Sequence, residues 1–161
     1  MGRGMIYLAA ILILAGLTWF FDGALDRQVN PNQRPQSSVQ GSIKEVVLDV
    51  NRHDQYVVTA RINGTPVDVL VDTGATEVAL SERLARSLNL EQGPAVMIST
   101  ANGVAQGHQT LLDEVRVGDI SVNNIRAMVV PNMSHPDVLL GMNFLRDLEM
   151  IQRDGQLILR Q

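Results

Sequence analysis

Residues 70–76 read LVDTGAT, and the interpretation of the whole chain starts from this stretch. Two apolar, β-forming residues run directly into an acid, Asp72, a hydroxyl residue, Thr73, and a glycine, Gly74. An acid at the end of a buried strand loses its hydration, which is costly unless the carboxylate is paired or has a chemical role. Gly74 permits a sharp turn and a close approach to the backbone. Taken alone, the pattern also fits an ordinary turn.

The composition narrows the classes of protein to which the chain can belong. Its 161 residues leave room for one globular domain. The absence of cysteine excludes disulfides, thiolate catalysis and zinc sites built on cysteine. From residue 41 onward there are 10 basic and 15 acidic residues, a net charge of −5. No basic stripe is evident in that composition, so we expect no nucleic-acid partner.

An apolar run precedes the domain. Residues 5–21 read MIYLAAILILAGLTWFF, without a charge, and a helix of this length spans roughly 25 Å, near the lower limit for crossing a bilayer. Tyr7 and Trp19 stand near its two ends, where aromatic rings favour the headgroup region. A cleaved signal peptide is the alternative, but the run closes on bulky residues rather than the small ones that cleavage requires. We therefore predict a transmembrane anchor.

The organisation predicted around this anchor has four parts. Residues 1–4 form a cytoplasmic head and residues 5–21 the anchor, because Arg3 lies close to the apolar run. Residues 22–41 are polar and contain prolines, asparagines and glutamines without an apolar period, which predicts a flexible linker. Residues 42–161 form the folded domain on the far side of the membrane.

Alternating apolar residues predict that this domain is mainly β, a partly barrel-like arrangement of about nine short strands with two short helices. Two-residue turns are indicated by Asn63-Gly64, by Asn102-Gly103 and by Asp154-Gly155. Ser81 can cap a short helix over residues 82–88, and a second short helix follows Gly141. The predicted strands include residues 43–50, 56–62, 66–71, 96–100, 104–111, 114–117, 120–130 and 157–159.

With these elements placed, residues 43–161 resemble the retropepsin family of aspartic proteases, in particular its bacterial members with a single membrane-spanning anchor. The resemblance rests on residues 71–76 (VDTGAT), on residues 139–145 (LLGMNFL) and on the Asn102-Gly103 hairpin between them, where the family carries its flap. The chain departs from the retroviral pattern in two ways: the flap turn is Asn-Gly rather than glycine-rich, and a helix separates the acid from the flap.

The resemblance implies a retropepsin-like, closed or partly open β-barrel and an aspartic endopeptidase that acts on a protein or peptide substrate. It implies that Asp72 is catalytic and that the flap closes over an extended peptide. It makes residues 157–159 a candidate strand for pairing with a second copy of the chain. The implied support of the catalytic loop comes from Thr73, Gly74 and Gly141, and the implied substrate contacts come from Ala75, Thr76, Ala101, Asn102 and Gly103.

The chemistry requires two carboxylates around one water molecule, but this chain contains a single Asp-Thr-Gly. A twofold homodimer would bring two copies of Asp72 together, so we expect a homodimer. We expect no cofactor and no metal, since His135 and Asp137 have no evident third partner. Glu77 is expected to be a solvated side chain or part of a pocket wall. The alternative function is a catalytically silent peptide-binding or assembly module at the membrane.

The predicted location follows from the anchor and the resemblance together. The chain would be a single-pass protein of the bacterial inner membrane, attached to the lipid bilayer through its N-terminal helix, with the catalytic domain in the periplasm. A cut within the linker, which would release a soluble enzyme, is the remaining alternative.

Overall fold

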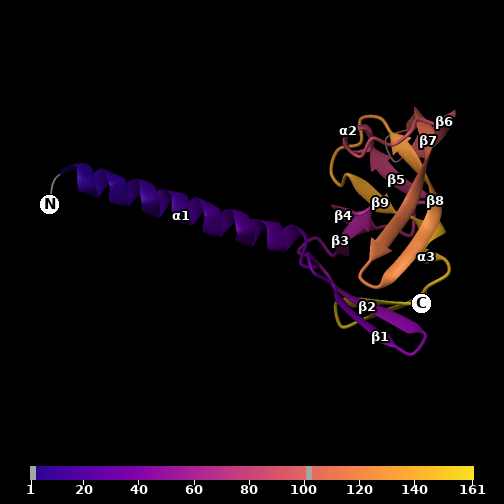
Figure 1. Cartoon of the computed structure of the whole chain (residues 1–161), viewed down its shortest axis with the longest axis horizontal. Coiled ribbons are helices and arrows are strands. Elements are labelled where there is room, and N and C mark those ends of the chain that lie inside the picture. Colours follow the sequence, from indigo (N-terminus) through magenta and orange to yellow (C-terminus); the bar gives the residue numbers. More distant parts are fainter. Residues whose placement is uncertain (1–2, 101–102) are drawn as a thin grey trace.

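Two β-sheets and one long projecting helix make up the described part of the protein (Figure 1). The computed structural model describes residues 3–100 and 103–161. The larger sheet has the strand order β3-β4-β9-β5-β8-β7-β6, and the smaller has the order β1-β2-β11-β10. The helices are α1 (Arg3–Val29), α2 (Glu82–Ser87) and α3 (Met142–Leu145). The strands are β1 (Gln36–Gln40), β2 (Ile43–Asp49), β3 (Val57–Ile62), β4 (Thr65–Val71), β5 (Val78–Ser81), β6 (Ala95–Thr100), β7 (Gly103–Val117), β8 (Ile120–Val130), β9 (Val138–Leu140), β10 (Glu149–Arg153) and β11 (Gln156–Arg160).

The tight turns predicted from the sequence are confirmed wherever the structure describes them. Asn63 and Gly64 join β3 to β4 with φ values of 48° and 82°, and Asp154 and Gly155 join β10 to β11 with φ values of 50° and 75°. Two consecutive residues with positive φ match the right-handed twist of the strands that they connect. The third predicted turn includes Asn102, which lies outside the described residues.

The two strands predicted over residues 104–111 and 114–117 are one continuous strand, β7. Strand β8 pairs with it from His108↔Val129 to Val117↔Ile120. Asp113 is exposed, so its charge lies on the solvent side and does not interrupt the strand. A polar residue at an outward position is compatible with a continuous strand whose other face is buried.

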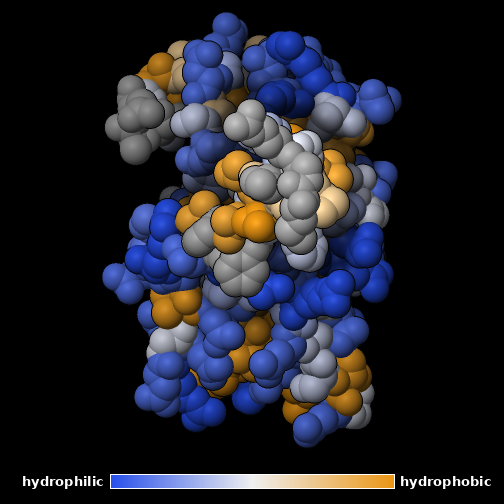
Figure 2. All heavy atoms as spheres, turned by 90° about the vertical axis from the view of Figure 1, so that its left-hand side faces the viewer, coloured by the Kyte–Doolittle hydropathy of each residue, from blue (hydrophilic) through white to orange (hydrophobic). Residues whose placement is uncertain are grey.

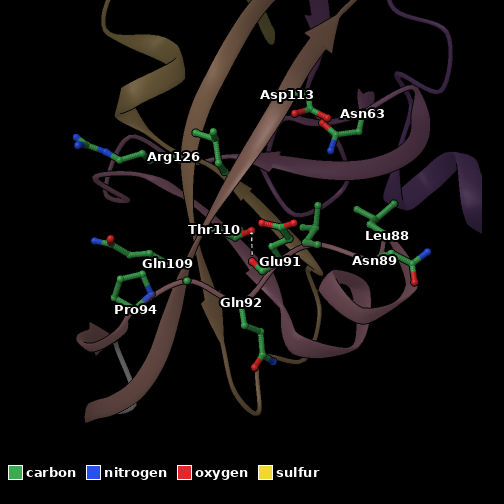
Figure 3. Close-up of a pocket in the computed structure, with 13 residues that line it drawn as sticks. Asn63, Leu88, Asn89, Glu91, Gln92, Pro94, Gln109, Thr110, Asp113 and Arg126 are labelled. Atoms are coloured by element: carbon green, nitrogen blue, oxygen red, sulfur yellow. Dashed lines mark hydrogen bonds between the residues drawn. The ribbon is translucent and has the colours of Figure 1, made fainter.

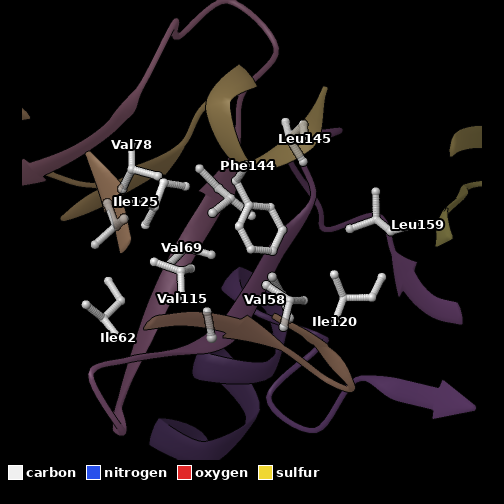
Figure 4. Close-up of a cluster of buried hydrophobic side chains, with 14 of the residues drawn as sticks. Val58, Ile62, Val69, Val78, Val115, Ile120, Ile125, Phe144, Leu145 and Leu159 are labelled. Atoms are coloured by element: carbon white, nitrogen blue, oxygen red, sulfur yellow. The ribbon is translucent and has the colours of Figure 1, made fainter. Parts of the chain in front are cut away.

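The core lies where the two sheets and α3 meet (Figure 4). Phe144 of α3 is 1% exposed and lies among buried side chains that include Val58 and Val69. Leu159 contributes from the smaller sheet. Because α3 places Phe144 in this core, the segment that follows Gly141 is fixed against the rest of the domain. Ser81 caps α2 as predicted, since its Oγ accepts a hydrogen bond from Leu84 N at 3.2 Å.

The flexible linker predicted over residues 22–41 is wrong. Helix α1 continues through its first part to Val29, and β1 occupies residues 36–40 in its last part. Strand β1 pairs with β2 from Gln36↔Val47 to Gln40↔Ile43. Polar strands of this kind carry no apolar alternation, because an edge strand exposed on both faces buries none of its side chains.

Three buried asparagines hold the junction between α1 and β1. Asn30 Nδ2 donates to Thr59 Oγ1 at 2.9 Å and to Asp68 Oδ1 at 2.7 Å. Asn51 Nδ2 donates to the last carbonyl of α1, that of Val29, at 2.9 Å. The side chain of Asn32 donates to the carbonyl oxygens of Asp49 and Val57 and accepts from Asp49 N at 2.7 Å. The junction therefore belongs to the folded domain, which begins well before the predicted boundary at residue 42.

Helix α1 exposes apolar side chains on all its sides. The four consecutive residues 11–14 are all exposed, and four residues cover more than one helical turn. In the view from the α1 side, apolar atoms of the helix stand in front of a largely hydrophilic face (Figure 2). Among the residues that the structure describes, no helix combines the length and the apolar character that crossing a membrane demands. The transmembrane anchor predicted over residues 5–21 is therefore not supported by the structure.

The role predicted for residues 157–159 also requires correction. These residues lie in β11, which pairs with β2 on one side and with β10 on the other. Both edges of β11 are occupied within one chain, so it cannot pair with a second copy in this arrangement. The edge strands of the smaller sheet are β1 and β10.

Candidate active site

The predicted catalytic residue follows the end of β4, directly beside the second motif. Strands β4 and β9 run parallel, with Leu70 opposite Leu139 and Val71 opposite Leu140. Asp72 N donates to Leu140 O at 3.1 Å, which extends the pairing by one step. The structure thus brings together two segments almost seventy residues apart, as the resemblance implied.

A local turn orients the carboxylate. Gly74 N donates to Asp72 Oδ1 at 2.8 Å, and Ala75 N donates to Asp72 O at 3.3 Å. This is the geometry in which an aspartate side chain accepts from the backbone two residues further on. Asp72 is half-buried, whereas Thr73 and Gly74 are exposed. Within the described residues the carboxylate accepts no other hydrogen bond, so Oδ2 is left for another group.

Gly141 lies against the back of the catalytic loop, as the resemblance implied. A Cβ atom at Gly141 would lie 2.4 Å from Glu77 O and 2.9 Å from Ala75 O, distances that a real Cβ does not reach. The adjacent amide, Met142 N, donates to Ala75 O at 2.8 Å. Glycine is required here because the two segments approach each other backbone to backbone.

Asn143 belongs to the site although no sequence motif predicted a role for it. Its amide N–H donates to Thr76 O at 3.1 Å, and its side-chain Oδ1 accepts from Val78 N at 3.0 Å. Its side-chain Nδ2 donates to Arg126 O on β8 at 2.7 Å. One side chain therefore ties the end of the catalytic loop to the start of β5 and to β8. The only signal in the sequence is an amide residue two positions after Gly141.

Glu77, predicted to be solvated or part of a pocket wall, is mostly buried. Its side chain is 16% exposed, and its Oε1 lies 3.4 Å from Nε of Arg126. Its Oε2 is buried and has no hydrogen-bond partner among the described residues. Arg126 stays 73% exposed, so this ion pair is open to solvent on one side only. Arg126 lies on β8, and its carbonyl oxygen is the group to which Asn143 Nδ2 donates.

A cleft of ≈ 650 Å³ lies between the α2–β6 connection and β7 (Figure 3). Leu88, Glu91 and Gln109 are among its lining residues, and Thr110 Oγ1 donates to Glu91 O at 2.8 Å across it. Asp72 does not line this cleft. The half-buried carboxylate of Asp72 instead lies beside the exposed Thr73.

The flap predicted between the two motifs corresponds to the β6–β7 hairpin, which pairs from Ala95↔His108 to Thr100↔Gly103. Gly103 begins β7 with a φ of 111°. Ala101 and Asn102, two of the predicted substrate contacts, lie outside the described residues. At the base of the hairpin Gly93 N donates to Gln109 O at 2.8 Å, and Gln109 N donates to Pro94 O at 2.9 Å.

The described residues contain no cluster of three or more side chains suited to a metal ion. Asp137, considered with His135 in the sequence, is engaged elsewhere: it accepts from Ser81 Oγ at 2.7 Å and pairs with Arg83 at 2.6 Å. Burial alone would raise the pKa of Asp137, but the hydrogen bonds from Arg83 and Ser81 outweigh it and lower the pKa below its usual value. The carboxylate of Asp137 therefore bonds to residues at the start of α2.

This chain is similar to several known proteins. The family described as gag-polyprotein putative aspartyl protease matches residues 58–147. A Sinorhizobium sp. protein, described as an uncharacterized protein in the cobV 5′ region, is 38% identical over 121 residues, which are 73% of this chain and 52% of that protein. The chain thus spans about half the length of this curated relative.

Two solved structures are also similar. A retropepsin-like aspartic protease from Rickettsia conorii has a TM-score of 0.61 at 25% identity, over 79% of this chain and 95% of that one. The EIAV protease in complex with the inhibitor HBY-793 has a TM-score of 0.49 at 24% identity, over 60% of this chain and 90% of that one. The family match covers more than half of the 161 residues and includes both Asp72 and Gly141. The chain belongs to the retropepsin-like aspartic proteases.

Proposed function

We propose that the protein is an aspartic endopeptidase that acts as a homodimer, with one Asp72 from each protomer. The observation that carries this proposal is the orientation and partial exposure of the Asp72 carboxylate. Gly74 N fixes one oxygen of the carboxylate, while the loop that bears it lies on an open surface with Thr73 exposed. An oriented, half-buried acid on an open surface suits a site that a second copy completes.

The proposed chemistry uses the two Asp72 carboxylates as one unit. Two like charges within hydrogen-bonding distance do not both ionise readily, so the pair holds a single proton. The ionised carboxylate accepts a proton from water while the water oxygen attacks the scissile carbonyl carbon, and the neutral carboxyl donates to the carbonyl oxygen. The C–N bond then breaks as the leaving nitrogen takes a proton from the pair. The pair ends with one proton, as it began.

The surroundings of Asp72 support the roles that we propose for the loop residues. Thr73 is exposed, and its side chain has no hydrogen bond within the described single chain, so we propose that it bonds to the partner's loop. Ala75 N, Ala75 O and Thr76 O already bond within the chain, so the substrate would contact Ala75 and Thr76 on the outer side of the loop, where Thr76 is exposed. Gly141 and Asn143 would support that loop from behind, which keeps the carboxylate in place during the reaction.

The first test replaces the acid. Asp72→Asn should lower peptide cleavage by at least about a hundredfold, because loss of general acid–base catalysis has that order of effect. The matched control is Asp54→Asn, since Asp54 is exposed in a turn with a φ of 57°, a conformation that asparagine also adopts. Cleavage that survives Asp72→Asn would exclude the mechanism. A folded dimer of the natural chain that cleaves no peptide would favour the silent binding module instead.

The second test asks whether two chains share the site. Asp72→Asn protein in threefold excess should lower the activity of a fixed amount of natural protein to about a quarter, because random exchange leaves few dimers with two acids. Asp54→Asn in the same excess should add its own activity. Activity that is unaffected by the inactive variant would show that one chain suffices.

The location of the protein is a separate part of the proposal. Single-pass attachment to the inner membrane, with the domain in the periplasm, stays a prediction from the sequence. What supports attachment is that α1 exposes apolar residues on every side, which soluble monomers rarely do. Fractionation should place the full chain with membranes and a chain that starts at residue 25 in the soluble fraction. A full chain in the soluble fraction would exclude attachment.

A further inference from the structure

A second cleft, of ≈ 330 Å³, lies at the junction that follows α1. Three segments that are distant in the sequence form it: the chain between α1 and β1, the β3–β4 hairpin and the end of β7. Its lining contains three arginines and no acid. The lining residues are Gln33, Arg34, Pro35, Thr59, Arg61, Pro66, Arg116 and Gly118. We call this the arginine cleft.

Two of these arginines stand directly opposite each other. Arg61 on β3 and Arg116 on β7 are register partners in an antiparallel pair. Like charges at this position destabilise a sheet. Arg116 is compensated by Glu114, since its Nη2 lies 2.6 Å from Glu114 Oε1. Arg61 forms no ion pair with an acid of the described residues, and its side chain donates instead to a neutral carbonyl, Gly64 O, at 2.8 Å.

The third arginine adds charge without a partner. Arg34 is exposed, and no carboxylate of the described residues lies within salt-bridge distance of it. Two other carboxylates lie beside residues of the cleft walls: Asp68 accepts from Thr59 Oγ1 at 2.6 Å, and Asp119 accepts from Ser37 Oγ at 2.5 Å. The cleft thus gathers three guanidinium groups, two of which, those of Arg34 and Arg61, form no ion pair within the described residues.

The surrounding structure holds this arrangement in place. Pro35 and Pro66 restrict the backbone on two sides, and Asn32, which is 3% exposed, fixes the segment directly before Gln33. Thr59, which lines the cleft, accepts a hydrogen bond from Asn30 and donates one to Asp68. Mutual repulsion of arginines in a rigid cleft is a cost in the unliganded protein that an anion would remove.

We propose that the arginine cleft binds a phosphate group. Guanidinium groups pair with phosphate oxygens through parallel hydrogen bonds, and Arg34 and Arg61 have donors to spare. The cleft begins four residues after the end of α1, at Gln33. The phosphate can therefore come from the headgroup of an anionic lipid beside the apolar helix, or from a soluble phosphate ester. This proposal does not depend on catalysis by Asp72.

The experiment uses the full chain in neutral detergent, titrated with inorganic phosphate and with glycerol 3-phosphate, and then floated with lipid vesicles. One set of vesicles is phosphatidylcholine alone, and the other also contains phosphatidylglycerol. The variants are Arg34→Gln, Arg61→Gln and the two together. Arg153→Gln is the control, because it removes the same charge from an exposed position on β10, outside the cleft. Arg34→Gln should fold normally, since that side chain has no described hydrogen bond or ion pair.

A lipid headgroup as the source predicts tighter binding to the anionic vesicles, weakened about fivefold by each cleft substitution and unchanged by the control. A soluble source predicts that both kinds of vesicle bind equally, while either phosphate compound binds the natural chain and each cleft substitution weakens that binding. The proposal is overturned if no phosphate compound binds and the vesicles do not differ. It is also overturned if Arg153→Gln weakens binding as much as Arg34→Gln.

Discussion

The catalytic loop and the junction after α1 are both irregular stretches of backbone held by asparagine amides, but they leave their polar groups in different states. In the catalytic loop, Asn143 and Gly141 secure the backbone and leave Asp72 half-buried, with one oxygen that has no partner among residues 3–100 and 103–161. At the junction, Asn30 and Asn32 are buried and their side chains bond to the domain. The first stretch leaves a carboxylate oxygen available for the proposed reaction, whereas the second uses its polar side chains within the domain.

The difference indicates how substitutions should divide between function and stability. A change behind the catalytic loop should displace Asp72 and act on activity as well as on folding. A change at the junction should act on folding alone, because no junction residue touches the proposed reacting groups. The predictions below test this division, in order of decreasing effect.

Gly141→Ala should have the largest effect. A Cβ there would lie 2.4 Å from Glu77 O, so the loop must move. We expect a loss of about 3 kcal/mol in the free energy of unfolding and a loss of about a hundredfold in kcat/KM. Urea unfolding and a peptide-cleavage assay measure the two. Gly16→Ala is the control, because a Cβ at Gly16 meets nothing within 4 Å. Activity close to that of the natural chain would show that the loop tolerates displacement.

Asn32→Ala should come next and act on stability. It removes the partner of two carbonyl oxygens and one amide, all at the junction. Buried polar groups that lose their partners cost about 1–3 kcal/mol each, and partial access of water leaves an expected total of about 3 kcal/mol. The exposed Asn123→Ala is the control. Under conditions where both proteins are folded, kcat/KM should be unchanged. A fall in kcat/KM would mean that the junction communicates with the active site.

The same contrast explains what the sequence could and could not predict. The hairpin at Asn63-Gly64 could be predicted because a positive φ favours particular residue types, asparagine and glycine among them. The turn at Asp72 could be predicted because its side chain accepts a hydrogen bond from Gly74 N, only two residues further along the chain. The roles of Asn30 and Asn32 could not be predicted, because their partners on the domain lie 17 to 38 residues away. In the sequence, a buried asparagine also looks the same as an asparagine in a flexible linker.

The arginine cleft and Asn143 were unreadable for a related reason. The cleft brings together three arginines, Arg34, Arg61 and Arg116, that are far apart in the sequence. Their proximity depends on the β3–β7 pairing and on the junction, so no local sequence pattern predicts it. Asn143 follows a recognised glycine, but its three partners are backbone groups of other segments. Interactions with the backbone leave no trace in the types of the partner residues.

Asn143→Ala should lower both stability and activity, and each effect should be smaller than that of Gly141→Ala. We expect a loss of about 2 kcal/mol, because Val78 N and Arg126 O lose their partner. Activity should fall about tenfold, since the amide of Asn143 and Gly141 still hold the loop. Asn143→Asp distinguishes the bonds: it keeps the acceptor for Val78 N and loses the donor to Arg126 O. An Asp variant as impaired as the Ala variant would show that the bond to β8 is the important one.

Arg83→Gln should have the smallest effect and touch neither region. Asp137 has a lowered pKa in the folded chain, so its pairing stabilises the protein at pH values above its unfolded pKa. That stabilisation is lost as the pH falls through the lower, folded pKa. Because Arg83 is 75% exposed, the pair should contribute at most about 1 kcal/mol at pH 7. Urea unfolding of the natural and variant chains should therefore differ at pH 7 and converge at acidic pH. A difference that persists in acid would mean that Arg83 acts through packing on α2 and not through the charge of Asp137.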